Sequence, residues 1–391
     1  MPVFYNYTEG GVVYSFDDVF VPADAFREGN LWVWGRNNNG QLGINNTNTR
    51  CTPVTTSTGG ANWKQVSGGD IHRAAIKTDG TLWAWGLNSY GQLGVNDAGA
   101  GLNRSTPVTT FAGGTNWKQV ACGYNFTAAI KTDGTLWTWG LNSDGQLGVN
   151  NLTSPRCTPV TTFAGGTNWK QVACGGQYTA AIKTDGTLWT WGINFLGHLG
   201  DNTTSDKSTP ITTFAGGTNW KQVSAGDAHA AAIKTDGTLW TWGYNFLGQL
   251  GDNTAITRSI PVTTFAGGTN WKQVSCGSNH TAAIKTDGTL WTWGRNSDGQ
   301  LGTGGGDKPT PVQVASATKW KQVSCLNLNT AAIQTDGTLW TWGANSYGQL
   351  GVGDRFSRGS PVTTFAGGTI WKQVSCGGNH IAATTYIDSY Q

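Results

Sequence analysis

Charged side chains are scarce in this chain of 391 residues, since Asp, Glu, Lys and Arg together make up 12% of it. The formal net charge is only +3 and no run of Lys or Arg occurs, which argues against a specific nucleic-acid partner. No apolar stretch approaches the length of a membrane span, and residues 1–30 lack the charged and apolar regions of a secretory signal. We therefore expect neither a membrane span nor Sec-dependent export.

Motifs that carry catalysis are also missing. The sequence has no Gly-Lys-Ser/Thr phosphate loop, no His-Glu-x-x-His, no Gly-x-Ser-x-Gly and no convincing pair of carboxylates. Its recurrent Thr-Asp-Gly segments are typical of hairpins and not of calcium loops. We expect no enzymatic activity, no cofactor and no metal site.

The cysteines occur at equivalent places in a repeated sequence. One position holds Cys122, Cys174, Cys276, Cys325 and Cys376, and a second holds Cys51 and Cys157. Equivalent positions in neighbouring repeats pair only if rotation brings their Cα atoms within roughly 7 Å. Small buried thiols are the better interpretation, and they imply synthesis in a reducing compartment.

Tryptophan is abundant and strictly periodic. A Trp-x-Trp-Gly motif occurs seven times at spacings of 49 to 54 residues, and a Trp-Lys-Gln-Val block follows each copy. Three tryptophans in each of seven repeats account for all 21 in the chain. Such self-similarity indicates a repeat architecture.

Residues 107–140 illustrate one repeat, which we predict to form four strands. The strands are expected at 107–111, 118–122, 127–131 and 136–139, separated by Ala-Gly-Gly, a variable loop and Asp-Gly. A two-residue type I′ turn at Asp133-Gly134 places Lys131 opposite Leu136, Ile130 opposite Trp137 and Ala128 opposite Trp139. One face of each four-stranded unit would then be aromatic and would need a neighbour to cover it.

The two ends of the chain complete one another. The last repeat stops near residue 385 without its Leu-Trp-x-Trp-Gly strand, and residues 31–35 supply that strand before any complete repeat. We predict an all-β, seven-bladed β-propeller with four-stranded antiparallel blades. The ring would close by pairing the strand at 31–35 with the strand near 381–385.

The repeats resemble those of the regulator-of-chromosome-condensation-1 (RCC1-like) family. The motifs that carry the resemblance are Asp-Gly-x-Leu-x-x-Trp-Gly, the Asn-x-x-Gly-Gln-Leu-Gly loop at 142–148 and Cys-Gly-x-x-His-Thr at 276–281. The resemblance covers residues 31–385 and implies the same propeller. For function it is less specific, because the family includes exchange factors, ubiquitin-ligase modules and a secreted inhibitor. No repeat has room for the extra β-wedge of the exchange factor, and no basic nuclear tail is present.

Variation between repeats is concentrated in two of the four connections. In an antiparallel meander these two connections share one face, so we expect one variable face for binding and one constant face; neutral drift of exposed loops is the alternative. The candidate binding residues are His72, Phe126, Tyr178, His229, His280, Asn329, His380, Arg36, Tyr244 and Arg295. Asp70 and Asp227 lie two residues before a histidine, but this family motif carries His routinely, so we expect no metal or acid–base site there.

A basic residue precedes the first proline of every repeat by three positions. These residues are Arg50, Arg104, Arg156, Lys207, Arg258, Lys308 and Arg358. They could form a cationic ring for an anionic ligand, but strict repetition favours a structural role on the neighbouring blade.

Residues 1–30 fall outside the repeats and are rich in aromatic and β-branched side chains. We divide the chain into a docking segment, 1–30, and a propeller, 31–391, and expect the segment to bind another chain. Packing beneath its own propeller is the alternative. The docking residues are Tyr14, Phe16, Val19 and Phe20.

Neutral polar surface residues and close-packed tryptophans suit an exposed particle component, yet the chain has no export signal and no disulfide framework. We therefore expect a phage virion component, such as a tail fibre, baseplate or capsid-surface protein. It would be made in the host cytoplasm, would act in the virion and would contact virion proteins or a host-surface glycan. Homo-oligomers through residues 1–30 are a further option. The alternatives are a cytoplasmic signalling adaptor or exchange factor for a small GTPase, and a secreted protein inhibitor.

Overall fold

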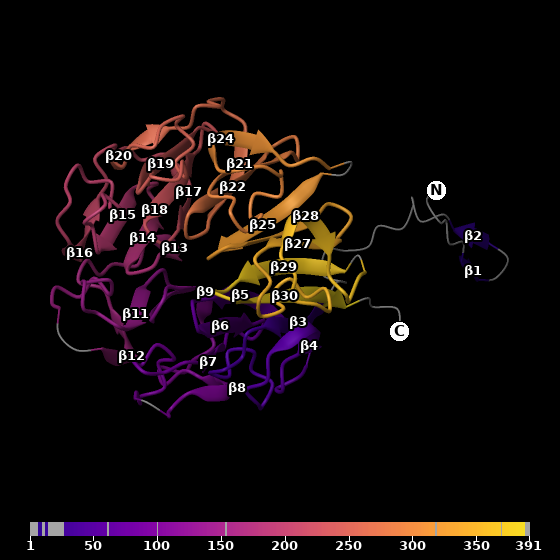
Figure 1. The fold of residues 1–391 in the computed structure, drawn as a ribbon. Helices are drawn as coiled ribbons and strands as arrows, with labels where there is room; N and C mark the ends of the chain where they lie inside the picture. The colour runs from indigo at the N-terminus through magenta and orange to yellow at the C-terminus, as the bar shows by residue number, and fades with distance from the viewer. Residues whose placement is uncertain are drawn as a thin grey trace.

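The computed structural model describes residues 7–9, 12–14, 27–60, 62–99, 101–152, 155–316, 319–368 and 370–387. Every regular element in this part of the chain is a β-strand. Seven four-stranded antiparallel sheets are arranged around a common axis (Figure 1), which confirms the predicted seven-bladed propeller. Among these residues no helix is long and apolar enough to cross a membrane.

Each blade is a meander in which the first strand lies nearest the axis. The strands are, blade by blade, β5 (Trp63–Gly68), β6 (His72–Lys77), β7 (Leu82–Gly86) and β8 (Arg104–Thr109); β9 (Trp117–Cys122), β10 (Phe126–Lys131), β11 (Leu136–Gly140) and β12 (Arg156–Thr161); β13 (Trp169–Cys174), β14 (Tyr178–Lys183), β15 (Leu188–Gly192) and β16 (Lys207–Thr212); β17 (Trp220–Ala225), β18 (His229–Lys234), β19 (Leu239–Gly243) and β20 (Arg258–Thr263); β21 (Trp271–Cys276), β22 (His280–Lys285), β23 (Leu290–Gly294) and β24 (Lys308–Gln313); β25 (Trp320–Leu326), β26 (Asn329–Gln334), β27 (Leu339–Gly343) and β28 (Arg358–Thr363); and β29 (Trp371–Cys376), β30 (His380–Ile387), β3 (Arg27–Gly35) and β4 (Arg50–Thr55).

The predicted unit 107–140 crosses a boundary between blades. Strand β8 pairs with β7 of the preceding blade and not with β9. The β-branched strand therefore forms the outer edge of one blade, and Trp-Lys-Gln-Val begins the next blade at the axis. Sequence order alone does not distinguish these two groupings, because both contain four consecutive strands.

The last blade is closed by both ends of the chain, as predicted. Strand β3 pairs with β30, with Trp34 opposite Ile381 and Leu31 opposite Thr384. The pairing extends beyond the predicted strand, because Arg27 also faces Ile387. Residues 27–30 therefore belong to the closing sheet, and the segment that precedes the propeller ends at residue 26.

The register of the Asp-Gly hairpin differs from the prediction by one residue. Ile130 pairs with Leu136 and Ala129 with Trp137, because the loop has three residues and not two. Of the turn residues, Gly134 has a positive φ of 82° but Asp133 does not, so the turn is not type I′. A shift of one residue moves Ile130 to the face opposite the tryptophans. The aliphatic side chains therefore cover the next blade's indoles and not those of their own blade.

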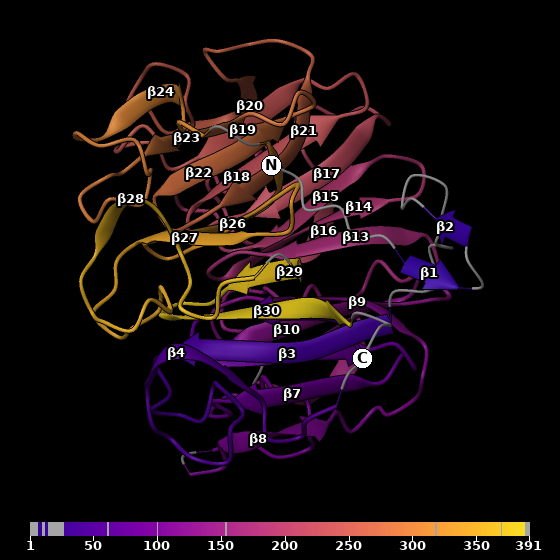
Figure 2. The same cartoon turned by 90° about the vertical axis from the view of Figure 1, so that its right-hand side faces the viewer.

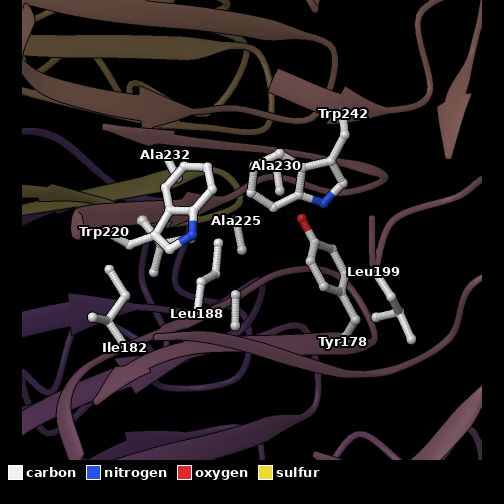
Figure 3. Packing of buried hydrophobic residues seen from close by; sticks show 11 residues of the cluster. Tyr178, Ile182, Leu188, Leu199, Trp220, Ala225, Ala230, Ala232 and Trp242 are labelled. Atoms are coloured by element: carbon white, nitrogen blue, oxygen red, sulfur yellow. The ribbon is translucent and has the colours of Figure 1, made fainter. Parts of the chain in front are cut away.

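Packing between blades buries an aliphatic face against an aromatic one. In the contact shown in Figure 3, Ile182 and Leu188 of one blade lie against Trp220 and Trp242 of the next. The two indoles are edge-on, with ring centroids 6.5 Å apart and planes at 63°. Burying one such indole removes about 150–250 Å² from water and contributes several kcal/mol as an upper bound. No blade could bury this face alone.

A belt of glutamines joins the inner strands. Gln119 Nε2 donates to Val172 O of the next blade at 3.0 Å, and its Oε1 accepts from Val172 N at 3.0 Å. Each of the seven Trp-Lys-Gln-Val glutamines makes this double contact, at Gln65, Gln119, Gln171, Gln222, Gln273, Gln322 and Gln373. The glutamine side chain of one inner strand therefore bonds both main-chain groups of a valine in the neighbouring blade.

Two short strands precede the propeller. Strands β1 (Tyr7–Glu9) and β2 (Val12–Tyr14) form a separate antiparallel pair. Of the predicted docking residues, Tyr14 is described only in its backbone, and Phe16, Val19 and Phe20 lie outside the described residues. Docking by this segment remains a prediction.

Candidate interaction face

The two kinds of connection lie on opposite faces of the ring. Connections such as β9–β10 and β11–β12 emerge on one face, and the Thr-Asp-Gly and Ala-Gly-Gly turns emerge on the other. Figure 2 shows the strands from the edge of the ring, running between these two faces. The variable face and the constant face predicted from the repeats are therefore distinct surfaces.

A cavity of about 190 Å³ lies on the axis between the inner strands. Its lining includes the ends of all seven inner strands, with serine hydroxyls and five thiols: Cys122, Cys174, Cys276, Cys325 and Cys376. All seven cysteines are free, and burial raises the pKa of Cys122, Cys276 and Cys376 to about 12. The five thiols on the axis are therefore protonated, buried groups, as the repeat pattern predicted, while Cys51 and Cys157 are half-buried.

The seven equivalent residues at the centre of the predicted binding set are buried and not exposed. His72, Phe126, Tyr178, His229, His280, Asn329 and His380 are each 0–1% exposed. Each begins the second strand of its blade, and its side chain is enclosed in the interior. The proposal that they contact a ligand needs correction, because a side chain without exposed surface touches no ligand in this structure.

The buried histidines connect one blade to the next. His72 lies 2.9 Å from Thr127 Oγ1, and His229 and His280 make the same contact with Thr281 and Thr330. Burial lowers the pKa of all three imidazoles to about 3, so they are neutral at physiological pH. The variability of this position reflects alternative ways of filling one interior space.

The two Asp-x-His sequences do not form paired sites. Each histidine faces a threonine, whereas Asp227 accepts a hydrogen bond from Tyr124 of another blade. No cluster of three or more His, Cys, Asp or Glu side chains that could hold a metal occurs among the described residues. The aspartates instead contribute to the polar centre of the variable face.

This polar centre consists of half-buried side chains around the axis. Burial raises the pKa of Asp70 and of Asp227, while Arg36 opposes the shift at Asp70. Tyr124 has a raised pKa, also mainly through burial, and remains a neutral phenol. The centre of the face therefore offers carboxylates and a hydroxyl to a partner.

Three predicted rim residues do reach the surface. The Arg36 guanidinium lies over the Tyr347 ring at 5.1 Å. Tyr244 stacks on Phe246, with centroids 6.4 Å apart and planes at 8°. Arg295 Nε donates to Ser297 Oγ at 2.7 Å. These three side chains are accessible to a ligand, and binding by them remains a prediction.

Two strongly exposed aromatic residues of this face, on adjacent blades, were not among the predicted binding residues. Phe195 is 59% exposed and Phe246 is 72% exposed, on the β15–β16 and β19–β20 loops of adjacent blades. The other blades carry Asn38, Ser89, Ser143, Ser297 and Ser346 at this position. Comparison of the repeats at this single position would have identified the two phenylalanines, because elsewhere the position is always polar.

The segment that follows this position in each loop is fixed by packing, as the equivalent β7–β8 loop shows. Leu93 is buried between blades, and Trp139 Nε1 of the next blade donates to Gln92 O at 2.9 Å. Gly94 has φ of 67°, and a Cβ there would lie 2.8 Å from the Trp139 indole nitrogen. The Gly-Gln-Leu-Gly segment therefore repeats because it joins blades, whereas the residues before and after it vary.

The predicted basic ring lies at the start of each outer strand. Four members pair with an aspartate of the preceding loop: Arg104 with Asp97, Lys207 with Asp201, Arg258 with Asp252 and Arg358 with Asp354. Arg50, Arg156 and Lys308 have no ion pair among the described residues, and their loops carry no equivalent acid. The ion pairs support the structural interpretation for four members. Anion binding by the ring remains a prediction.

Comparison with known proteins decides the family. The model of the RCC1-like domain matches residues 153–388, and that of the RCC1 repeat matches 28–76 and 79–130. The chain belongs to the RCC1-like domain family. This confirms the resemblance based on the repeat motifs.

Curated relatives of this RCC1-like chain include plant and human proteins. It is 34% identical to the ultraviolet-B receptor UVR8 of Arabidopsis thaliana, over 70% of this chain and 62% of the receptor. It is 29% identical to the mitochondrial RCC1 domain-containing protein RUG3 of the same plant, over 73% and 66% of the two chains. It is also 29% identical to the human E3 ubiquitin-protein ligase HERC2, over 70% of this chain but 6% of the ligase. The chain thus spans no more than about two thirds of these relatives.

Solved structures of other proteins have the same fold. Human WBSCR16 matches with a TM-score of 0.80 at 22% identity, over 92% of this chain and 99% of that one. Prp20p of Saccharomyces cerevisiae matches with a TM-score of 0.80 at 20% identity, over 93% and 92%. At these identities the likeness establishes the fold.

The comparisons overturn the prediction of a phage virion component. The relatives are receptors, RCC1-domain proteins and modules of ubiquitin ligases, and none of those named here is a tail fibre, baseplate or capsid protein. A neutral, tryptophan-rich composition was misleading because it is a property of these propeller repeats, in which indoles fill the contacts between blades.

Proposed function

We propose that this RCC1-like propeller is a non-catalytic adaptor that binds a protein partner through its variable face. The observation that carries the proposal is the pair of exposed phenylalanines, Phe195 and Phe246, on neighbouring loops. Ile256 on the second loop is also 59% exposed. A group of exposed apolar side chains on one face of a propeller is typical of a protein contact.

The surroundings of the two phenylalanines support the same proposal. The loops that carry them are held by buried Asn194 and Asn245, whose Oδ1 atoms accept from Leu199 N and Leu250 N at 3.0 and 2.9 Å. The aromatic side chains are thus presented on rigid loops, which lowers the conformational entropy lost on binding. The carboxylates of Asp70 and Asp227 at the centre of the face would add polar contacts to the same partner.

A test replaces both phenylalanines by the residue that other blades carry. Phe195→Ser with Phe246→Ser should leave the melting temperature nearly unchanged, because Ser143 and Ser297 occupy this position in two native blades. Partners retained by the parent chain in cells that produce it would be identified by mass spectrometry and then purified. We expect the double variant to bind the purified partner at least about 30-fold more weakly, which corresponds to about 2 kcal/mol.

The matched control is the pair Phe163→Ser and Phe214→Ser. These side chains are 65% and 62% exposed but follow the outer strands, near the constant face. The control should bind as the parent does. Equal affinity of the parent and the Phe195/Phe246 variant would contradict the proposal.

Exchange-factor activity on a small GTPase is the alternative. Prp20p has binding properties towards Gsp1p and histones, but its likeness to this chain is one of fold. The described residues of this propeller form seven blades of equal strand number, with no added element in any loop. A nucleotide-release assay with a purified small GTPase tests this alternative, and we expect no acceleration.

A further inference from the structure

The constant face carries a ring of lysines around the axis. Each inner strand begins Trp-Lys-Gln-Val, and in every blade the pairing with the second strand shifts at this lysine. Such a bulge turns the extra residue out of the ladder. The seven lysines are Lys64, Lys118, Lys170, Lys221, Lys272, Lys321 and Lys372, of which the first six are exposed.

A second set of lysines lies further from the axis on the same face. Their ammonium groups lie 4.4–4.6 Å from the half-buried indole of the adjacent strand. These residues are Lys77, Lys131, Lys183, Lys234 and Lys285. The indole retains the cation at the surface without neutralising its charge.

Acidic groups on the constant face are too few to balance these cations. With Lys319 the face carries thirteen lysines, against the six aspartates of the Thr-Asp-Gly turns, a formal excess of +7. The turn aspartates are engaged locally; Asp133 Oδ1, for example, accepts from Thr135 Oγ1 at 2.7 Å. Among the described residues no carboxylate forms an ion pair with Lys64, Lys118, Lys170, Lys221 or Lys272. All five ion pairs that the structure describes involve loops of the variable face or the outer strands that follow them.

The chain enters the propeller at this same face. Strand β3 starts at Arg27 opposite Ile387, where β30 ends (Figure 2). Near that point Lys321 Nζ donates to the Tyr386 hydroxyl at 3.2 Å. The segment 1–26 therefore joins the propeller beside the lysine ring. Twelve residues, 15–26, separate β2 from β3, and a chain of that length spans at most about 40–43 Å.

The composition of residues 1–26 complements the constant face. The segment contains four acidic residues, Glu9, Asp17, Asp18 and Asp24, and no Lys or Arg. It also has seven aromatic residues, which suit a face where indoles are half-exposed beneath the lysines. Its charge is opposite to that of the surface from which it emerges.

We propose that the acidic segment 1–26 binds the lysine face of its own propeller. The tether makes this contact intramolecular, so the effective concentration exceeds that of a free partner. From the sequence, we expected residues 1–30 to bind a second protein chain. The proposed contact is with the same chain, because the excess charge of the constant face becomes evident only in the assembled propeller. The contact leaves the variable face free and does not depend on the proposed adaptor function.

The test is cross-linking of the full chain with a carbodiimide, which joins a carboxylate directly to an amine. Equal amounts of unlabelled and ¹⁵N-labelled protein are mixed, and linked peptides are identified by mass spectrometry. We expect links from Glu9, Asp17, Asp18 or Asp24 to lysines of the inner strands, within molecules of one isotope. Links among Asp287, Lys285 and Lys319, whose charges interact on the same face, serve as the positive control.

A charge-neutral variant gives a second readout on the folded protein. In Glu9→Gln/Asp17→Asn/Asp18→Asn/Asp24→Asn, we expect the acetylation rate of the inner-strand lysines to rise about threefold at low salt. In the parent, high salt should produce a similar rise. Lys308, which lies near the variable face and has no ion pair among the described residues, provides a matched amine whose rate should not change.

Two outcomes would overturn the proposal. Links found only between unlike isotopes would assign the face to the segment of a second copy. Absence of links to residues 1–26, with positive-control links present and unchanged acetylation in the neutral variant, would show that the segment does not bind the face.

Discussion

The contact between the closing blade and the first blade differs from the regular contacts around the ring. At the contact between the first and second blades, His72 Nε2 lies 2.9 Å from Thr127 Oγ1. At the closing contact, the position of that threonine is occupied by Arg73. Both ring nitrogens of His380 consequently lack a hydrogen-bond partner among the described residues. The arginine thus removes a histidine–threonine link that three other contacts between blades have.

The side chain of Arg73 is fully buried, and its guanidinium makes only one long hydrogen bond among the described residues. Its Nη1 donates to Ser375 O at 3.4 Å, while Nε and Nη2 have no partner among the described residues. Burial lowers the pKa of the guanidinium to about 9. Gly68, directly opposite in the ladder, replaces the cysteine of five other blades and leaves room for the long side chain. The closing contact keeps the serine bond, with Ser375 Oγ accepting from Gly68 N at 3.0 Å, but lacks the histidine bond. We infer that closure depends mainly on strand pairing between the chain ends.

Removing the closing strand should have the largest effect. Deletion of residues 1–36 removes β3 and exposes the indoles that it covers, so we expect loss of the single cooperative melting transition of the whole ring. Deletion of 1–26 keeps β3 and should leave melting nearly unchanged. Differential scanning calorimetry distinguishes the two. If the chain starting at residue 37 melted like the parent, ring closure would not be what stabilises the propeller.

Exchanging the arginine and threonine tests the poorer contact directly. Arg73→Thr should raise the free energy of unfolding by about 1–3 kcal/mol, because a buried unpaired cation is removed and His380 gains a partner. The reverse change at a regular contact, Thr127→Arg, should lower it by about 3–5 kcal/mol. Denaturant unfolding measures both. A loss of stability in Arg73→Thr would show that the guanidinium has a favourable partner.

The glutamine contacts between inner strands differ in length between the closing contact and the others. Gln373 Nε2 lies 3.5 Å from Val66 O at the closing contact, whereas the regular distances are 3.0–3.1 Å. Gln119→Ala should cost about 1–3 kcal/mol by leaving two main-chain groups of Val172 unpaired. Gln373→Ala should cost less. Equal losses in denaturant unfolding would mean that the longer distance does not weaken the link.

The smallest expected effect concerns the dependence of the free energy of unfolding on pH. The pKa of His280 is about 3 in the folded state, so only the unfolded chain takes up a proton as the pH falls below about 6.5. Stability is therefore present above pH 6.5 and declines towards pH 3, by about 2 kcal/mol per histidine at pH 5. His280→Phe, which copies Phe126 of another blade, should flatten the pH profile of the melting temperature. At pH 7, His380→Phe should cost less than His280→Phe, because His380 makes no bond to a threonine. An unchanged pH profile in His280→Phe would contradict this assignment.

The fold was predictable because local and global patterns agree in every repeat. Trp-x-Trp-Gly spacing established seven units, and the incomplete final repeat predicted the pairing of 31–35 with 381–385. The blade boundary was not predictable, since β8 can follow or precede its neighbours equally well in sequence. The hairpin register failed because Asp-Gly suits both two- and three-residue loops.

The candidate site was predicted only in part. The variable face followed from repeat differences, yet the central histidines proved buried because their variation reflects packing against threonine. Phe195 and Phe246 could have been found by comparing one column of the repeats. Arg73 could not have been identified as an unpaired cation, because its lack of a partner depends on His380 and Ser375, some 300 residues away in sequence.

The pairing of β3 with β30 also has a consequence for the time course of folding. Most blades form from strands that adjoin in sequence, whereas this blade must bring together residues separated by about 350 positions. Chain-closure entropy grows slowly with length, so this step costs only about 2–3 kcal/mol more than closing a 20-residue loop. The effect on the folding rate is larger, because the closing sheet can form only after the six other blades. Until then, the open array exposes an unsatisfied strand edge at each end, through which two unfinished chains could complete one another.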